Sequence, residues 1–259
     1  MKRFALAALA VFALAACNQQ QAVAPPAPRE VSADAAHIVA AIADARRPQE
    51  DKDRDGARHA AETLAFAGIE PGDKVADLIP GGGYFTRLFA VAVGEEGRVY
   101  PVIRPDGVAK DFEMPILEVA AQYPNAVMAR TPYDALAFPE PLDVVFTAQN
   151  YHDMYLTEYE LGNAVNMNAS AFAALKPGGL YVVIDHSAVA GSALETDAQA
   201  ALHRIDQVRV RAEVEAAGFV FDGESEVLRN PADARAIRVF DPAIRGHTDQ
   251  FMMRFRKPE

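Results

Sequence analysis

The chain has 259 residues, a formal net charge of −11 and an apolar fraction of 51%. This length and apolar content suit one large soluble domain with its own core. The excess of acidic residues argues against nucleic acid as a partner, because phosphate binding requires a basic surface. Cys17 is the only cysteine, which excludes an internal disulfide and any site with several cysteine ligands.

The first 16 residues have the layout of an export signal. Lys2 and Arg3 form a basic start, residues 4–13 are an apolar run too short to span a bilayer, and Leu-Ala-Ala precedes Cys17. This ending resembles the lipobox of bacterial lipoproteins. The resemblance implies cleavage before Cys17, lipidation of Cys17 and a domain that faces the periplasm and meets the membrane only through its lipid anchor. The alternative is that Cys17 is an incidental small residue.

Next come an expected tether and two expected helices. Residues 17–33 include three prolines and show no apolar periodicity, which predicts an extended tether after the lipidated cysteine. Amphipathic patterns predict helices over residues 34–45 and 55–67, which would form an N-terminal helical cap over residues 34–70. The charged run at residues 49–55 is interpreted as a solvated connection between them.

From residue 71 to residue 259 the pattern alternates between strands and helices. Such alternation predicts an α/β, Rossmann-like fold: a seven-stranded, mostly parallel sheet with helices on both faces and an antiparallel last strand. Strands are expected over residues 75–79, 98–103, 126–129, 142–147, 180–185, 219–228 and 249–256. Helices are expected over residues 84–93, 111–122, 156–175 and 194–217.

A glycine-rich loop joins the first strand of this region to its first helix. Three glycines at 81–83 follow the strand at once, and Asp77 lies near the strand's end. Glycine lets a ligand approach the backbone, and free N–H groups at a helix start attract polar or anionic groups. Asp77 offers a partner for a cationic amine. A nicotinamide-type loop would need a glycine at Thr86, and no lysine follows as in a P-loop. The alternative is a turn that binds nothing.

Five segments in order carry a family resemblance. They read IEPGDKVAD at residues 69–77, GEEGRVY at 94–100, PYDALAF at 132–138, DVVF at 143–146 and LKPGGL at 175–180. On these segments the region from residue 71 to about 219 resembles the class I S-adenosylmethionine-dependent methyltransferases. The whole chain is similar to a group of bacterial proteins of that family that carry a signal peptide.

The resemblance implies S-adenosylmethionine as cofactor and methyl transfer to a small-molecule acceptor. Two positions depart from the family pattern: Ile79 stands at its first glycine, and Ile103 stands where an acid grips the ribose, with Asp106 nearby as a substitute. The implied cofactor-binding residues are Asp77, Gly81, Gly82 and Gly83 at the amino-acid end, Asp134 and Ala135 at the adenine, and Asn150 near the reactive methyl group.

Two histidine–aspartate pairs are the candidate catalytic groups. His152 and Asp153 follow the fourth strand, and Asp185 and His186 end the fifth. Neighbouring parallel strands bring their carboxyl ends to one edge, where open α/β sheets bind ligands. Histidine suits proton removal near neutral pH, and we expect His152 to be the base. The same four residues could instead hold a divalent metal, but neither His-x-His nor His-Glu-x-x-His occurs, and no metal site is assigned. Alternatively, each histidine only bonds the backbone.

Two further readings of the whole chain stay open. One is a ligand-binding lipoprotein of the cell envelope that keeps the methyltransferase fold without its activity. Export favours it, because S-adenosylmethionine is made in the cytosol. The other is a nicotinamide oxidoreductase, which would need the third glycine and an acid at Ile103. His203 and Arg204 are expected on a long helix, with Arg204 in a surface pair with Asp206.

Overall fold

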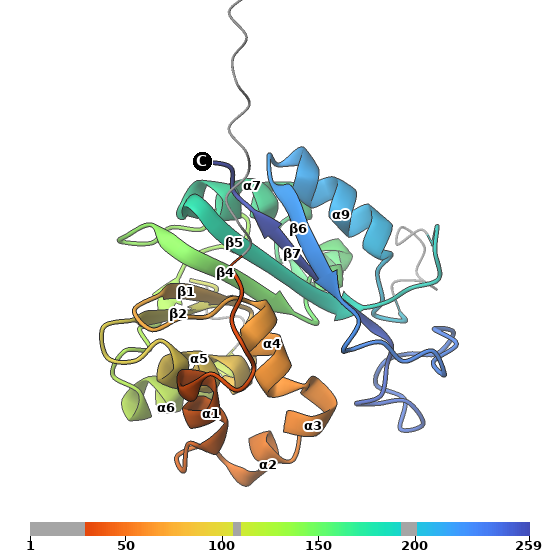
Figure 1. Ribbon diagram of the computed structural model, residues 1–259. Helices are drawn as coiled ribbons and strands as arrows, with labels where there is room; N and C mark the ends of the chain where they lie inside the picture. Colours follow the sequence, from red (N-terminus) through yellow and green to blue (C-terminus); the bar gives the residue numbers. More distant parts are fainter. Residues whose placement is uncertain (1–28, 106–109, 193–200) are drawn as a thin grey trace, which may run out of the picture.

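The computed structural model describes residues 29–105, 110–192 and 201–259 (Figure 1). The expected signal peptide, Cys17 and Asp106 lie outside the described residues. Within the described ranges no helix combines the length and the apolar character that crossing a bilayer requires.

A seven-stranded sheet forms the centre of the fold, with the order β3-β2-β1-β4-β5-β7-β6. Strands β1 to β5 pair in parallel, whereas β7 lies antiparallel between β5 and β6. The predicted mostly parallel sheet with an antiparallel last strand is confirmed. The strands are β1 Lys74–Leu78, β2 Arg98–Ile103, β3 Ala129–Arg130, β4 Leu142–Ala148, β5 Leu175–His186, β6 Val220–Ser225 and β7 Gln250–Arg256.

Helices cover both faces of the sheet (Figure 1). Side chains alternate between faces along each strand, so Val75 of β1 belongs to one apolar core and Ala76 to the other. Residues of α1, α4, α5 and α6 complete the first core, and residues of α7 and α9 complete the second. The helices are α1 Ala36–Ala43, α2 Gln49–Lys52, α3 Asp55–Arg58, α4 Ala60–Phe66, α5 Tyr84–Ala92, α6 Lys110–Gln122, α7 Ala164–Ala174 and α9 Gln207–Ala216.

The helix predicted over residues 156–175 is wrong in its first half. Two short 3-10 turns, η1 His152–Tyr155 and η2 Thr157–Tyr159, occupy that stretch. Gly162 then adopts a φ of +95°, which ends any helical continuation. The side chain of Asn163 accepts a hydrogen bond from the backbone N–H of Asn166 (2.8 Å) and so caps the start of α7.

The helix predicted over residues 194–217 is also shorter than expected. Among its described residues, helix begins only after Asp206, which caps α9 with its side chain. His203 therefore lies in a loop with a φ of +55°. The expected surface pair of Arg204 is wrong: Arg204 is buried and donates a 2.8 Å hydrogen bond to Asp233.

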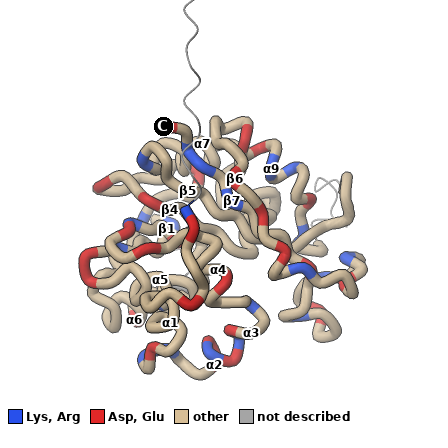
Figure 2. Tube along the Cα trace, in the orientation of Figure 1, with Lys and Arg blue, Asp and Glu red and all other residues tan. Residues whose placement is uncertain are grey.

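The charged run at residues 49–55 is not the solvated connection that we expected. It forms α2 and the start of α3, where acidic and basic residues alternate (Figure 2). Asp51 is buried and accepts a 2.9 Å hydrogen bond from Nη1 of Arg87, on α5. The same nitrogen donates to the carbonyl oxygen of Gly82 at 2.8 Å. The run therefore ties the helical cap to the glycine loop.

A second group of hydrogen bonds, around Asp55, holds the cap against the start of α5. Asp55 accepts hydrogen bonds from Nη1 of Arg47 (2.9 Å) and from the hydroxyl of Tyr84 (2.7 Å) at the start of α5. The expected continuous helix over residues 55–67 breaks at His59, whose φ is +42°. This break lets α3 turn toward the sheet edge while α4 packs in the core.

The end of the expected tether lies on the domain. Arg29 donates hydrogen bonds to Glu70 (2.9 Å) and Asp73 (2.8 Å), and Val31 packs against the first core. The part of residues 17–33 that the structure describes is thus part of the folded domain.

We predict that Asp51→Asn lowers the free energy of unfolding by about 1.5–3 kcal/mol, because it leaves the buried Arg87 guanidinium without its anionic partner. The matched control is Asp53→Asn, an exposed aspartate two residues along, for which a change within about 0.5 kcal/mol is expected. Urea unfolding measures both. Equal losses in the two variants would contradict the buried pair.

Candidate functional site

A cavity of about 610 Å³ lies where the carboxyl ends of β1, β2, β4 and β5 meet. Its walls come from the glycine loop, the cap, the segment after β4, the loops near His203, the ends of β2 and β5, and Tyr133. The lining residues used below are Arg54, Arg58, Asp77, Ile79, Gly81, Gly82, Ile103, Tyr133, Gln149, Asn150, His152, Asp153, His186 and His203.

The glycine loop presents its backbone to this cavity. A Cβ added at Gly81 or Gly82 would meet nothing within 4 Å, so both positions leave room for a ligand. Gly83 differs, because a Cβ there would lie 2.8 Å from Cγ2 of Val119, and it does not line the cavity. Its φ of +81° lets the chain enter α5. Gly81 and Gly82 thus face the ligand space, and Gly83 shapes the turn.

Ile79 holds a backbone conformation that suits glycine. Its φ is +54°, in the left-handed region that β-branched residues rarely adopt. This is also the position at which the family resemblance places a glycine. Such a conformation costs roughly 1–2 kcal/mol for a side-chain-bearing residue. The strain is therefore located in the wall of the cavity.

Asp77 is the acid at the end of β1. It is buried and accepts a 2.6 Å hydrogen bond from the hydroxyl of Thr86. Burial raises the pKa of Asp77 to about 7, while the Thr86 bond and the charge of Arg58 oppose the rise. A cationic ligand group beside Asp77 would compensate this buried carboxylate.

The cap supplies the facing wall. Arg58 lies with its guanidinium carbon 4.5 Å from the ring centre of Tyr84, and it donates a 3.0 Å hydrogen bond to Gln149. Burial, followed by the neighbouring charge of Arg54, lowers the pKa of Arg58 to about 10. The sequence analysis singled out neither arginine, because Arg54 lies in the charged run interpreted as a solvated connection and Arg58 lies in an expected amphipathic helix.

The other expected cofactor residues divide into two groups. Asn150 lines the cavity and donates hydrogen bonds to the carbonyl oxygens of Ile79 (3.1 Å) and Ala148 (2.7 Å). Asp134 and Ala135 are not among the described residues that line it, although their neighbour Tyr133 is. Ile103 also lines the cavity, at the position where the family has an acid.

His152, Asp153, Asp185 and His186 come together as expected, around the carboxylate of Asp185. Its Oδ1 lies 2.8 Å from Nδ1 of His152 and accepts a hydrogen bond from the backbone N–H of His186 (2.7 Å). Its Oδ2 accepts from the backbone N–H of His152 (2.8 Å). Asp185 is fully buried and does not line the cavity, so it orients the residues that do.

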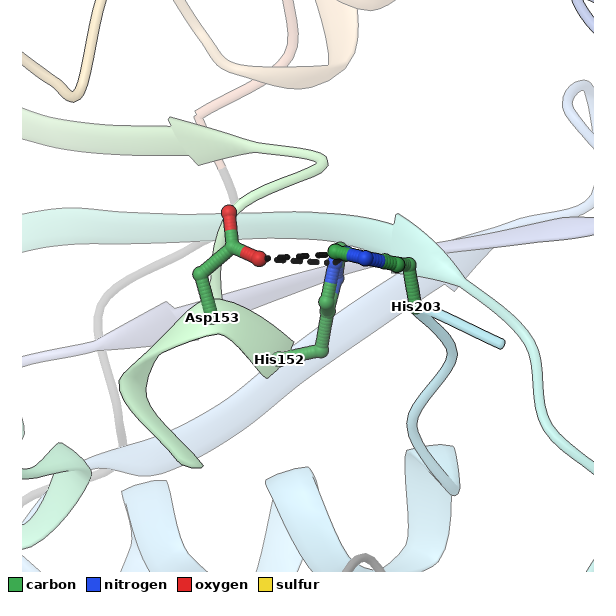
Figure 3. Close-up of side chains that lie close together, drawn as sticks. All are labelled: His152, Asp153 and His203. Carbon is green, nitrogen blue, oxygen red and sulfur yellow. Dashed lines mark hydrogen bonds and ion pairs between the residues drawn. The ribbon is translucent and has the colours of Figure 1, made fainter. Parts of the chain in front are cut away.

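His203 joins this cluster from a distant segment (Figure 3). Its Nδ1 lies 3.2 Å from Nε2 of His152 and 3.5 Å from Oδ1 of Asp153. The signal that could have revealed it is Asp206, a typical N-cap residue that precedes the apolar pattern of α9. A helix that starts at Asp206 leaves His203 in a loop.

His152 and His186, the histidines of the two expected pairs, have pKa values on opposite sides of neutrality and so differ in charge at pH 7. Burial alone would lower the pKa of His152, but the charges of Asp185 and Asp153 and its contacts with them raise it to about 10. Burial lowers the pKa of His186 to about 4 despite the charge of Asp185. The pKa of Asp153 is lowered, because its contacts with His152 and His203 outweigh its burial.

Comparisons with known proteins agree with this fold. No family model matches the chain. A curated relative is a ubiquinone/menaquinone biosynthesis C-methyltransferase, UbiE, of Teredinibacter turnerae, which is 29% identical over 136 residues covering 51% of each chain. The chain thus spans about half the length of the curated relatives it matches.

Two solved structures share the architecture. A methyltransferase of Aquifex aeolicus that depends on S-adenosylmethionine (SAM) has a TM-score of 0.55, 17% identity and coverage of 82% of this chain and 98% of its own. The [4+2]-cyclase SpnF has a TM-score of 0.56, 16% identity and coverage of 83% and 84%. The chain has the Rossmann-like fold of SAM-dependent methyltransferases. The cyclase shows that this fold is also found in a protein named for another reaction.

We predict that Ile79→Gly is more stable than Ile79→Ala by about 1 kcal/mol. Both variants lose the same packing, but only glycine adopts the left-handed conformation without strain. The same pair of substitutions at Ile103, inside β2, is the control, and there alanine is expected to be the more stable. Urea unfolding of the four variants tests this, and an alanine preference at both positions would refute the strain.

Proposed function

We propose that the chain is an S-adenosylmethionine-dependent methyltransferase that acts on a small-molecule acceptor bound in the cavity. The observation that carries the proposal is the pairing of a buried acid, Asp77, with the open backbone of Gly81 and Gly82 at the sheet edge. The methyltransferase name of the curated relatives and the shared fold support it. When bound, the cofactor supplies a methyl group carried on a sulfonium.

The residues of the cavity suit the amino-acid end of this cofactor. Asp77 pairs with its ammonium group, which removes the cost of an unpaired buried carboxylate. Arg58 and Arg54 supply positive charge for its carboxylate from the cap side. Gly81 and Gly82 allow close approach of the backbone, and Asn150 braces the loop through Ile79.

The proton of the acceptor needs a base other than the expected one. Nδ1 of His152 faces Asp185 and Nε2 faces His203, so neither ring nitrogen is free. His186 also lines the cavity, and its Nδ1 lies 2.7 Å from the hydroxyl oxygen of Thr248. Its Nε2 has no hydrogen-bond partner among the described residues. We therefore assign proton acceptance to Nε2 of His186, which is neutral at pH 7 because burial lowers its pKa to about 4, and which is for the same reason a weak base. Most of the rate enhancement would come from holding the acceptor in line with the methyl group.

The test is calorimetric titration of the purified domain with S-adenosylmethionine. Asp77→Asn is expected to weaken binding by roughly 10- to 150-fold, because a hydrogen bond to a charged group contributes about 1.5–3 kcal/mol. Asp143→Asn is the matched control. Asp143 is also buried but lies at the start of β4, at the opposite edge of the sheet, and binding should not change.

The same variant has a second expected effect, without ligand. The folded-state pKa of Asp77 lies above its unfolded value, so its contribution to stability falls as pH rises from about 4 to 7. Asp77→Asn removes that fall and raises the unfolding temperature at pH 8. If wild type fails to bind the cofactor, or if Asp77→Asn binds as well as wild type, the proposed site is wrong.

The second candidate function is ligand binding without turnover. Ile103 lines the cavity where the resemblance would place an acid, and Ile79 adds a bulky side chain to the lining where it would place a glycine. Both features favour a protein that holds a cofactor-like molecule without transferring a methyl group. Cofactor binding with no methylated product from any thiol, hydroxyl or amine acceptor would favour this function over the first.

We also propose that the chain is exported and anchored in the cell envelope through lipid on Cys17. The order of basic start, apolar run and small residues before Cys17 supports this. Cys17→Ser is expected to leave the precursor uncleaved and to abolish incorporation of labelled fatty acid. The control is a serine at Ala22, five residues further along, which should be labelled like wild type. Labelling that persists in Cys17→Ser would exclude this anchor.

A further inference from the structure

Three donor atoms from two distant segments form a small triangle at the cavity wall (Figure 3). Nε2 of His152 lies 3.0 Å from Oδ1 of Asp153 and 3.2 Å from Nδ1 of His203. The third side, from Nδ1 of His203 to Oδ1 of Asp153, measures 3.5 Å. All three residues line the cavity.

These separations match one face of a metal coordination shell. Nitrogen and oxygen ligands bind zinc tetrahedrally at about 2.0–2.1 Å, which places neighbouring ligand atoms about 3.3 Å apart. One ion beside the triangle could therefore contact all three atoms with little movement. Two imidazoles and one carboxylate suit zinc or another divalent transition metal, whereas magnesium prefers oxygen ligands.

The orientation of His152 is already that of a metal ligand. Metal-bound histidines usually direct their second ring nitrogen at a carboxylate, which fixes the ring and raises its basicity. Asp185 occupies this place, 2.8 Å from Nδ1 of His152, and two backbone N–H groups hold it there. Nε2 is thereby directed at the centre of the cluster.

The surroundings of Asp153 also suit a bound cation. Its Oδ1 is buried and has no hydrogen-bond partner among the described residues, although two ring nitrogens lie nearby. A buried carboxylate oxygen without an aligned hydrogen bond is rare, and here the charge of this oxygen is offset by the two ring nitrogens at 3.0 and 3.5 Å. A metal ion at the triangle would satisfy this oxygen.

The backbone of His203 is strained. Its left-handed φ of +55° is an unfavourable conformation, and its ring packs 4.8 Å from that of Phe240, centre to centre. Strained residues gather at functional sites, where the strain sets a geometry. One contact must change on metal binding: Arg238, an exposed side chain, lies 3.4 Å from Nε2 of His203 and turns away when that nitrogen carries the proton.

We propose that His152, Asp153 and His203 bind one divalent transition-metal ion of the zinc type, with its remaining coordination position open to the cavity. A thiol or hydroxyl of the acceptor fits that position, where the metal would favour its deprotonated form. The metal site rests on its own geometry, and only its role toward the acceptor rests on the proposed methyl transfer.

The experiment uses the purified protein, stripped with a chelator and titrated with zinc chloride and with cobalt chloride. Wild type is expected to bind one zinc ion per chain, and bound cobalt should give the visible absorption of a four-coordinate site. Asp153→Asn and His203→Asn should each weaken zinc binding by more than about 100-fold, since even outer-shell partners contribute about 10–100-fold. Asparagine tolerates the conformation at position 203. His247→Ala, at an exposed histidine, is the control and should bind like wild type.

Two results would overturn the site. One is wild type that binds no zinc at micromolar concentrations, and the other is zinc binding that Asp153→Asn and His203→Asn leave unchanged while circular dichroism shows that both are folded. Titration of the zinc-loaded and stripped proteins with S-adenosylmethionine separates the two proposals. Zinc binding without cofactor binding would refute the methyltransferase and leave the metal site, and the reverse would refute the metal site alone.

Discussion

The arrangement of the cavity depends on one buried carboxylate, that of Asp185. It ends β5, is fully shielded from solvent and accepts hydrogen bonds from the backbone N–H groups of His152 and His186. These bonds join the segment after β4 to the end of β5. An ionised carboxylate is stable in such a place only because these donors and the ring of His152 surround it. The positions of His152 and His186 follow from it, and His203 joins them through its contact with His152.

Much of the fold could be predicted from the sequence, because its strands and helices produce local periodic patterns of apolar residues. Buried strands, alternating helices and the loop before α5 appear as apolar runs and glycines, and the expected sheet is confirmed. Asp77 was found in the same way, from its place near the end of the first strand, whereas Asn150 was carried over from the family resemblance and does line the cavity. Asp134 was carried over from the family resemblance, and in this structure it lies outside the cavity lining.

The residues that were missed share a physical cause. His203 and Arg58 stand next to breaks where the chain adopts left-handed conformations, at His203 itself and at His59. Histidine adopts left-handed conformations more often than most residues, but this preference is weak beside a continuous amphipathic pattern, which suggested helices that continue through both places. What sets these turns is tertiary: packing against Phe240 for the first, and the contact of Arg58 with Tyr84 and Gln149 for the second. The apolar periodicity of the sequence contains no information on either of these tertiary contacts.

The way in which the chain enters the domain has a mechanical consequence. Arg29 bonds Glu70 and Asp73, directly before β1, whereas the cap helices that follow Arg29 in the chain touch the cavity. A pull on the chain before residue 29 is therefore resisted first by the ion pairs of Arg29 beside the start of β1. The cap lies in the chain between Arg29 and β1, and both of these points are held by the domain. Force that arrives from the N-terminal side therefore reaches the domain without passing through the cap. A ligand held under the cap would be insulated from force that arrives along the chain before residue 29.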